Sequence, residues 1–146
     1  MKKNRLLVLI ILLTLFLSFS CQKKTIKEYN INEKEEFIKL VYDSINDEKQ
    51  MYCAFEFRTK ENYENGHIRQ FQNYDLSVGN VDDFLNYMKS NYSDKVKVII
   101  MCEDDEIINA LKKYYNDLYI YHNSYETLGD VSSLFTIDKG PYNCMC

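Results

Sequence analysis

The hydrophobic and polar positions of the chain switch between helical and strand spacing from about residue 33 onward. Over 33–47 apolar side chains recur at helical intervals, which predicts an amphipathic helix. Its apolar face consists of Phe37, Ile38, Val41, Tyr42 and Ile45. Asn32, followed three residues later by Glu35, predicts a capping pair for this helix. Over 51–58 apolar and polar residues alternate, which predicts a strand.

The segment 80–122 carries the clearest pattern in the chain. Four apolar residues at helical spacing predict a helix over 81–92 behind Asn80 as cap. A continuous β-branched run over 95–102 predicts a strand that is buried on both faces. A helix over 105–116 behind Asp104 and a strand over 118–122 follow. A strand, a helix and a strand joined by short loops predict a parallel, right-handed βαβ unit.

The pattern between these segments and toward the C-terminus is weaker. Residues 59–67 are polar, and Asn65-Gly66 is a turn sequence, so 68–75 is expected to pair back as a second strand. Val131, Leu134 and Phe135 are expected to be buried, and a turn at 138–141 precedes the last residues. The whole predicts one small α/β layer domain over 31–146, with a mixed sheet of four or five strands and about three helices.

The first 20 residues have the organisation of an export signal. Lys2, Lys3 and Arg5 form a basic start, and residues 6–19 form an apolar run of 14 residues that only Thr14 and Ser18 interrupt. A helix that spans a bilayer needs about 20 apolar residues, so this run fits a cleavable signal peptide better. An uncleaved N-terminal anchor helix is the alternative.

The apolar run ends in Leu17-Ser18-Phe19-Ser20-Cys21, and here the segment resembles the signal of bacterial lipoproteins. Ser20 directly before Cys21 matches the lipobox, whereas Phe19 is bulkier than usual and Ser18 stands where Leu is commonest. The resemblance implies cleavage before Cys21, a diacylglyceryl group on its sulfur and acylation of the new amine. Several acyl chains together anchor a protein firmly.

The resemblance also implies a location in the cell envelope. Residues 1–20 would be the signal peptide, and residues 21–30 would be the lipidated Cys21 and a polar tether. The domain that follows would be extracytoplasmic, anchored through lipid to the outer or the cytoplasmic membrane. Gln22 is not the Asp that retains enterobacterial lipoproteins at the inner membrane.

Charge excludes one class of partner. The signal holds three of the 18 basic residues and no acidic residue, so the mature part has 15 basic residues against 22 acidic ones. An acidic domain with scattered lysines lacks the cationic patch that displaces phosphate counterions. We therefore expect no nucleic-acid partner. The membrane, through the lipid anchor, and a protein or small-molecule ligand are the partners that this composition leaves open.

Apart from Cys21 the chain has four cysteines, Cys53, Cys102, Cys144 and Cys146, and an even number outside the cytoplasm permits two disulfides. Cys53 and Cys102 lie on predicted strands and are expected to pack as buried thiols. A disulfide within Cys144-Met145-Cys146 would be strained and reactive, which suggests a thiol redox role. If the two are structural instead, one should pair with Cys53 or Cys102.

The same C-terminal residues suggest a third interpretation, a soft-metal binding protein. Two thiolates and a thioether suit Cu(I), with His67 or His122 as further ligands. Two cysteines alone do not define a site, and the spacing brings neither histidine close. No metal ligand and no cofactor are therefore assigned, and His122 is expected at a surface or edge.

Glu103-Asp104-Asp105-Glu106 follows the strongest predicted strand, at the sheet edge where ligands bind in open α/β sheets. Such carboxylates could hold Ca²⁺ or Mg²⁺ or act as acid and base. The favoured interpretation is that they complement the backbone N–H groups and dipole of the next helix. Tyrosines could form a ligand-stacking face, although many of them are needed to cover the sheet; they are Tyr114, Tyr115, Tyr119, Tyr121 and Tyr125.

Motifs for the common enzyme classes are missing from the sequence. There is no Gly-x-Ser-x-Gly, no His-Glu-x-x-His, no phosphate-binding glycine loop and no dinucleotide fingerprint. The sequence therefore favours a membrane-tethered envelope lipoprotein with a small soluble binding or interaction domain, not an enzyme, and assigns no catalytic residue. The alternatives are a thiol redox domain that uses the C-terminal Cys-x-Cys and a soft-metal binding protein.

Overall fold

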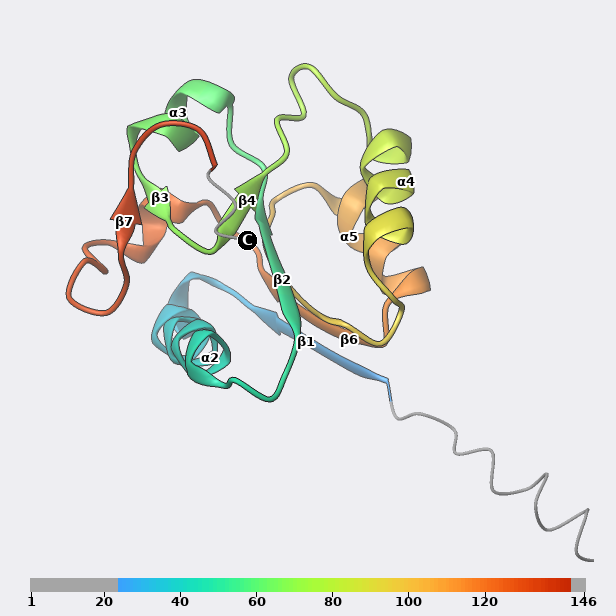
Figure 1. Cartoon of the computed structure of the whole chain (residues 1–146), viewed down its shortest axis with the longest axis horizontal. Coiled ribbons are helices and arrows are strands. Elements are labelled where there is room, and N and C mark those ends of the chain that lie inside the picture. The colour runs from blue at the N-terminus through green and yellow to red at the C-terminus, as the bar shows by residue number, and fades with distance from the viewer. Residues whose placement is uncertain (1–23, 143–146) are drawn as a thin grey trace, which may run out of the picture.

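Strand β5 lies at the centre of the main sheet, and all of its residues are buried. The computed structural model describes residues 24–142, which form an α/β domain around this sheet (Figure 1). The strand order is β1-β6-β5-β2-β4, and every neighbouring pair is parallel. The strands are β1 (Thr25–Tyr29), β2 (Tyr52–Glu56), β4 (Phe71–Asn73), β5 (Lys97–Met101) and β6 (Asp117–Tyr121).

Helices cover both faces of the sheet and give the domain two cores. Helix α2 (Lys34–Asn46) packs on one face, and α4 (Val81–Asn91) and α5 (Asp105–Tyr114) pack on the other (Figure 1). Alternate residues of each strand supply the two cores, because successive side chains of a strand point to opposite faces. On β5, Ile100 packs under α4 and α5, and Ile99 packs under α2.

The predicted βαβ unit is confirmed. Strands β5 and β6 are parallel and α5 connects them. Both predicted caps are also present, since Asn80 accepts a hydrogen bond from the Asp83 backbone and Asp104 accepts from the Glu106 and Ile107 backbone. The first helix begins differently from the prediction. A short 3-10 helix (Ile31–Glu33) precedes α2, so the capping box comes from Asn30 and Glu33 and not from Asn32 and Glu35.

The hairpin predicted for 68–75 is wrong, although part of this segment, β4, does pair with β2. Asn65-Gly66 ends a short helix, α3 (Lys60–Asn65), and is not the turn of a hairpin. Strand β3 (His67–Ile68) then pairs antiparallel with β7 (Ile137–Asp138) in a separate two-stranded sheet. Strand β4 pairs with β2 in parallel, which requires a crossover connection, and the segment with α3 and β3 supplies it.

Two further expectations need correction. Residues 25–29, placed in a polar tether, form β1, which extends the sheet by pairing with β6. The main sheet therefore has five strands, as expected at most, but is entirely parallel and not mixed. Leu134 is 49% exposed, whereas Val131 and Phe135 are buried as predicted.

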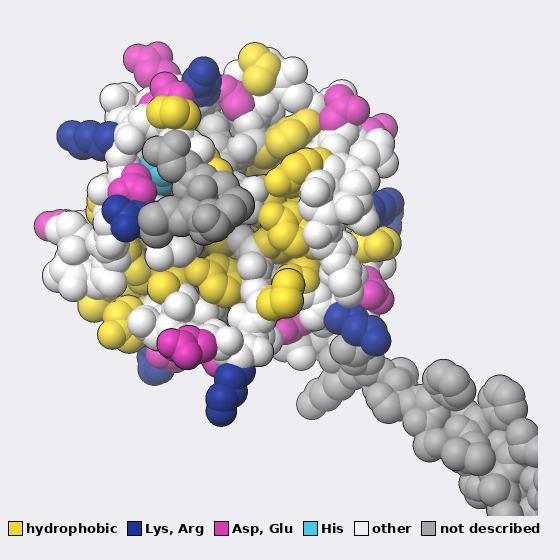
Figure 2. All heavy atoms as spheres, in the orientation of Figure 1, with side chains coloured by type: hydrophobic (Ala, Val, Ile, Leu, Met, Phe, Trp, Pro, Cys, Tyr) yellow, Lys and Arg dark blue, Asp and Glu magenta, His cyan; other side chains and the backbone are white. Residues whose placement is uncertain are grey.

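On the face of the molecule seen in Figure 2, hydrophobic side chains gather in the middle, whereas most charged side chains lie around the margin. Within residues 24–142 no helix has both the length and the apolar character that a bilayer-spanning segment requires.

Candidate functional site

A pocket of about 230 Å³ lies where β2, β5 and β6 reach their carboxyl ends. In open α/β sheets this edge is the usual place for a ligand. We call it the carboxyl-edge pocket. Its wall consists of Glu56, Phe57, Arg58, Leu76, Met101, Cys102, Glu103, Asp104, Asn123, Ser124 and Tyr125.

Glu56, the last residue of β2, is a buried acid in this wall. It lies opposite Met101 in the sheet register, and its side chain is only 1% exposed. Oε1 accepts two hydrogen bonds from Arg58, from Nε at 2.8 Å and from Nη2 at 2.6 Å. The other oxygen, Oε2, is buried and has no hydrogen-bond partner among the described residues. One half of the carboxyl group is therefore free to accept.

The Arg58 guanidinium uses all of its donors within the protein. Nη1 donates to Glu126 Oε1 at 2.8 Å and to the Asn62 carbonyl at 3.2 Å, and Nη2 also donates to the Gly66 carbonyl at 2.8 Å. With the two bonds to Glu56 these account for the five N–H donors of an arginine. The guanidinium also lies 4.5 Å from the ring centroid of Tyr125. Arg58 thus ties β2, α3 and the segment after β6 together.

Burial dominates the protonation of Glu56. Loss of hydration raises the pKa of this carboxyl to about 7, against the opposing charge and hydrogen bonds of Arg58. The neighbouring Glu126 carboxylate raises the pKa further. Glu56 is therefore poised to change charge near neutral pH.

Cys102 is the thiol of the pocket and follows the last residue of β5. Its side chain is buried, and Sγ donates to the Asp104 carbonyl at 3.7 Å. Burial first, then the nearby carboxylates, raises its pKa to about 12, although the contact with the Asp104 backbone acts in the other direction. The dipole of α5 would favour a thiolate, but Asp104 caps this helix and Asp105 and Glu106 occupy its first turn. Cys102 is held as a neutral thiol.

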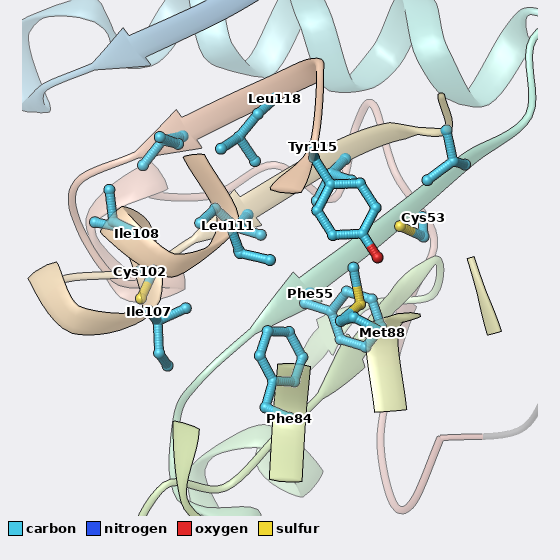
Figure 3. Close-up of a cluster of buried hydrophobic side chains, with 14 residues drawn as sticks. Cys53, Phe55, Phe84, Met88, Cys102, Ile107, Ile108, Leu111, Tyr115 and Leu118 are labelled. Atoms are coloured by element: carbon cyan, nitrogen blue, oxygen red, sulfur yellow. The ribbon is translucent and has the colours of Figure 1, made fainter. Parts of the chain in front are cut away.

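The structure separates Cys53 from Cys102. Cys53 lies near the start of β2, opposite Val98, whereas Cys102 lies beyond the end of β5. Figure 3 shows the two sulfur atoms on opposite sides of the same buried cluster. Both are free thiols, and burial raises the pKa of Cys53 to about 12 as well. Cys21, Cys144 and Cys146 lie outside the described residues.

The two histidines considered as metal ligands lie apart. His67 is buried in β3, where its ring stacks on Tyr63 at 3.7 Å and Nδ1 contacts the Tyr63 carbonyl at 3.0 Å. His122 lies after β6, and its Nε2 is 2.7 Å from Glu28 Oε2. Over residues 24–142 no three His, Cys, Asp or Glu side chains are grouped as a metal ion would require.

The four acidic residues after β5 have different roles in the structure. Asp104 caps α5 with its side chain, as predicted, and Asp105 and Glu106 lie in the first turn of that helix. Glu103 and Asp104 also contribute to the wall of the carboxyl-edge pocket. Among the tyrosines, Tyr115 and Tyr121 are fully buried core residues, and Tyr125 lies at the pocket.

Glu56 and Arg58 do not stand out in the sequence as site residues. The alternating pattern assigns Glu56 to the polar side of a strand, but β2 is a central strand with helices on both faces, so that side is buried too. The available signal is a Glu and an Arg two residues apart at the end of a strand, a spacing that places both on one face.

Comparisons with known proteins bear on the fold. The chain matches no protein-family model and no curated protein. A crystal structure of the Alr3790 protein from Anabaena sp. is similar over 70% of this chain and 89% of that chain, with a TM-score of 0.54 and 10% identity. A solution structure of the rhodanese-like domain of the same protein covers 82% of this chain and 91% of its own, with a TM-score of 0.43 and 11% identity. The likeness to the crystal structure confirms the α/β class.

Proposed function

We propose that this protein is a membrane-tethered lipoprotein of the cell envelope whose α/β domain binds a small ligand in the carboxyl-edge pocket without transforming it. The pocket lies at the sheet edge that open α/β folds use for ligands, and it combines apolar walls with a few polar groups. The tether rests on the basic start, the apolar run and Ser20-Cys21 of the sequence.

The observation that carries a binding role is the state of the pocket's polar groups. A nucleophilic cysteine needs a lowered pKa, and Cys102 has a raised one. Stabilisation of a developing negative charge needs unused donors, and those of Arg58 are all engaged. Neither Cys102 nor Arg58 is therefore prepared for a reaction, whereas the pocket can hold a ligand.

Chemical-shift mapping by NMR tests this role. We expect members of a panel of small charged and neutral aromatic fragments to perturb the amides of Phe57, Leu76 and Ser124. Asn123→Trp should fill the pocket and abolish these shifts. Asn32→Trp, on an exposed residue outside the pocket wall, should leave them unchanged. Shifts that persist in Asn123→Trp, or that lie elsewhere in both variants, would contradict a site in this pocket.

The rival function is covalent thiol chemistry at Cys102, which its place in the pocket wall favours. Alkylation by iodoacetamide followed by mass spectrometry separates the two. A binding role predicts that Cys102 in the native protein at pH 8 reacts far more slowly than in urea. Rapid native alkylation of Cys102 would favour the rival.

A further inference from the structure

We propose that the carboxyl-edge pocket selects a small primary amine in its ammonium form, whose N–H groups donate to Oε2 of Glu56. This inference rests on the proposed function and adds the chemical class of the ligand. It is built from the unused acceptor of Glu56, the saturated donors of Arg58 and the composition of the remaining wall.

The free oxygen of Glu56, Oε2, would be stabilised by a hydrogen-bond donor. Burying a carboxylate oxygen without a hydrogen bond is costly, and the described residues leave Glu56 Oε2 in that state. Glu56 contributes to the pocket wall, so a small rotation of its side chain would bring the buried Oε2 to a ligand in the pocket. A donor on the ligand would satisfy the oxygen, and a cationic donor would form the stronger, charge-assisted bond.

The saturated donors of Arg58 count against an anionic ligand. Arg58 is the cationic residue of the pocket wall, and its five donors are bound by Glu56, Glu126 and two backbone carbonyls. An anion would therefore find no free N–H on Arg58. It would also meet Glu103 and Asp104 in the same wall, and like charges at close range repel.

The remaining wall favours an organic cation over a metal ion. No group of three metal-ligating side chains exists among residues 24–142, so Glu56 has no partners for a coordination sphere. Phe57, Leu76 and Met101 supply apolar surface around it. An ammonium group on a compact apolar body matches this mixture of one acid and several hydrophobic contacts.

The protonation of Glu56 supports the same ligand. Burial raises the pKa of this carboxyl to about 7, because its charged form is poorly solvated. An ammonium group beside Oε2 would stabilise the charged form, so the ligand would lower the pKa that burial has raised. Ligand binding should therefore strengthen as the pH rises through 7.

The test uses benzylammonium, benzyl alcohol and benzoate as cationic, neutral and anionic probes of similar size at pH 8, with affinities from NMR titrations. For the wild type we expect benzylammonium to bind at least about tenfold more tightly than the other two. Glu56→Gln keeps the acceptor for Arg58 but removes the charge, and should weaken benzylammonium about tenfold. Glu126→Gln is the matched control, since Glu126 contacts the same guanidinium but is not in the pocket wall. This variant should bind benzylammonium about as tightly as the wild type does.

A second measurement does not depend on the folding of the variant. The wild type should bind benzylammonium more weakly at pH 5.5 than at pH 8. At pH 5.5 Glu56 is protonated and has lost its negative charge, whereas the amine keeps its positive charge. The titratable groups that interact with Glu56 are Arg58, Tyr63, Tyr125 and Glu126, and Cys102, Glu103 and Asp104 share the pocket wall with it. The pKa values of Tyr63 and Tyr125 are raised, first by burial. Burial opposes the lowering of the Glu126 pKa, but hydrogen bonds, that of Arg58 foremost, outweigh it.

The outcomes separate the two proposals. Equal or tighter binding of benzyl alcohol or benzoate in the pocket would overturn selection of an amine while leaving a binding pocket intact. Equal affinity of wild type and Glu56→Gln for benzylammonium would also overturn it. Binding of no probe at this edge would count against the proposed function itself.

Discussion

Arg58 contacts Glu56 through a single carboxylate oxygen. Nε and Nη2 both donate to Oε1, at 2.8 and 2.6 Å, and Oε2 is left buried without a hydrogen-bond partner among the described residues. An arginine fork commonly engages both oxygens of a carboxylate. Here the other guanidinium donors bind Glu126 and two backbone carbonyls. Within the described residues, only one of the two carboxylate oxygens of Glu56 is therefore hydrogen-bonded.

The first consequence is a dependence of stability on pH. The pKa of Glu56 is about 7 in the folded protein, against 4.5 for the free side chain, so the folded state binds this proton more tightly than the unfolded state. The free energy of unfolding should therefore fall as pH rises from about 4.5 to about 7, by roughly 3 kcal/mol in full. Urea denaturation across this range should show that the free energy of unfolding of the wild type falls with pH more steeply than that of Glu56→Gln. Parallel curves for the two proteins would contradict it.

A second prediction concerns the Arg58 network. Arg58→Lys keeps the charge but cannot reproduce five donors in one plane, and the guanidinium is only 9% exposed. We expect a loss of at least ~2 kcal/mol in urea denaturation, because buried Glu56 and the Asn62 and Gly66 carbonyls lose partners. Arg69→Lys is the control, since the Arg69–Asp138 pair is about one-third exposed and should lose less than ~1 kcal/mol. Equal losses would show that Arg58 has no special structural role.

The sequence predicts the elements whose signals are local. Asn80 and Asp104 are followed by helices, and the apolar pattern after each is long enough to define a face, so both caps are found in place. The βαβ unit around β5 is also predictable, since a continuous β-branched run followed by an amphipathic helix and a second apolar run is typical of such a unit.

The elements that the sequence does not predict depend on distant partners. Strand β1 is polar and becomes a strand because β6 pairs with it, and the parallel direction of β4 depends on its pairing with β2. The carboxyl-edge pocket also depends on segments that are distant in sequence. Glu56 and Arg58 are ordinary charged residues until α3 and the segment after β6 enclose them.

The third prediction tests the core beneath α4 and α5. Ile100 is fully buried at the middle of the sheet, so Ile100→Ala should lower the free energy of unfolding by roughly 2–5 kcal/mol. Val78→Ala, on an exposed residue, should change it by less than ~0.5 kcal/mol. A loss below ~1 kcal/mol for Ile100→Ala would show that the strand is peripheral.

The fourth prediction concerns the proposed tether, whose residues lie outside the described part of the chain. Expression in a bacterium that processes lipoproteins should yield a protein that lacks residues 1–20 and carries acyl chains on Cys21. Intact mass spectrometry measures both changes, and Cys21→Ser should block both. Unmodified full-length wild type would contradict lipidation.

The most direct measurement of the central claim is a ¹³C NMR titration of the Glu56 carboxyl carbon, assigned by comparison with Glu56→Gln. We predict a midpoint near pH 7 in the free protein, since burial sets this pKa. Added benzylammonium should move the midpoint to lower pH, because the cation stabilises the carboxylate whose Oε2 it contacts. A midpoint near 4.5 that benzylammonium does not move would contradict both the half-paired acid and the ligand that we assign to it.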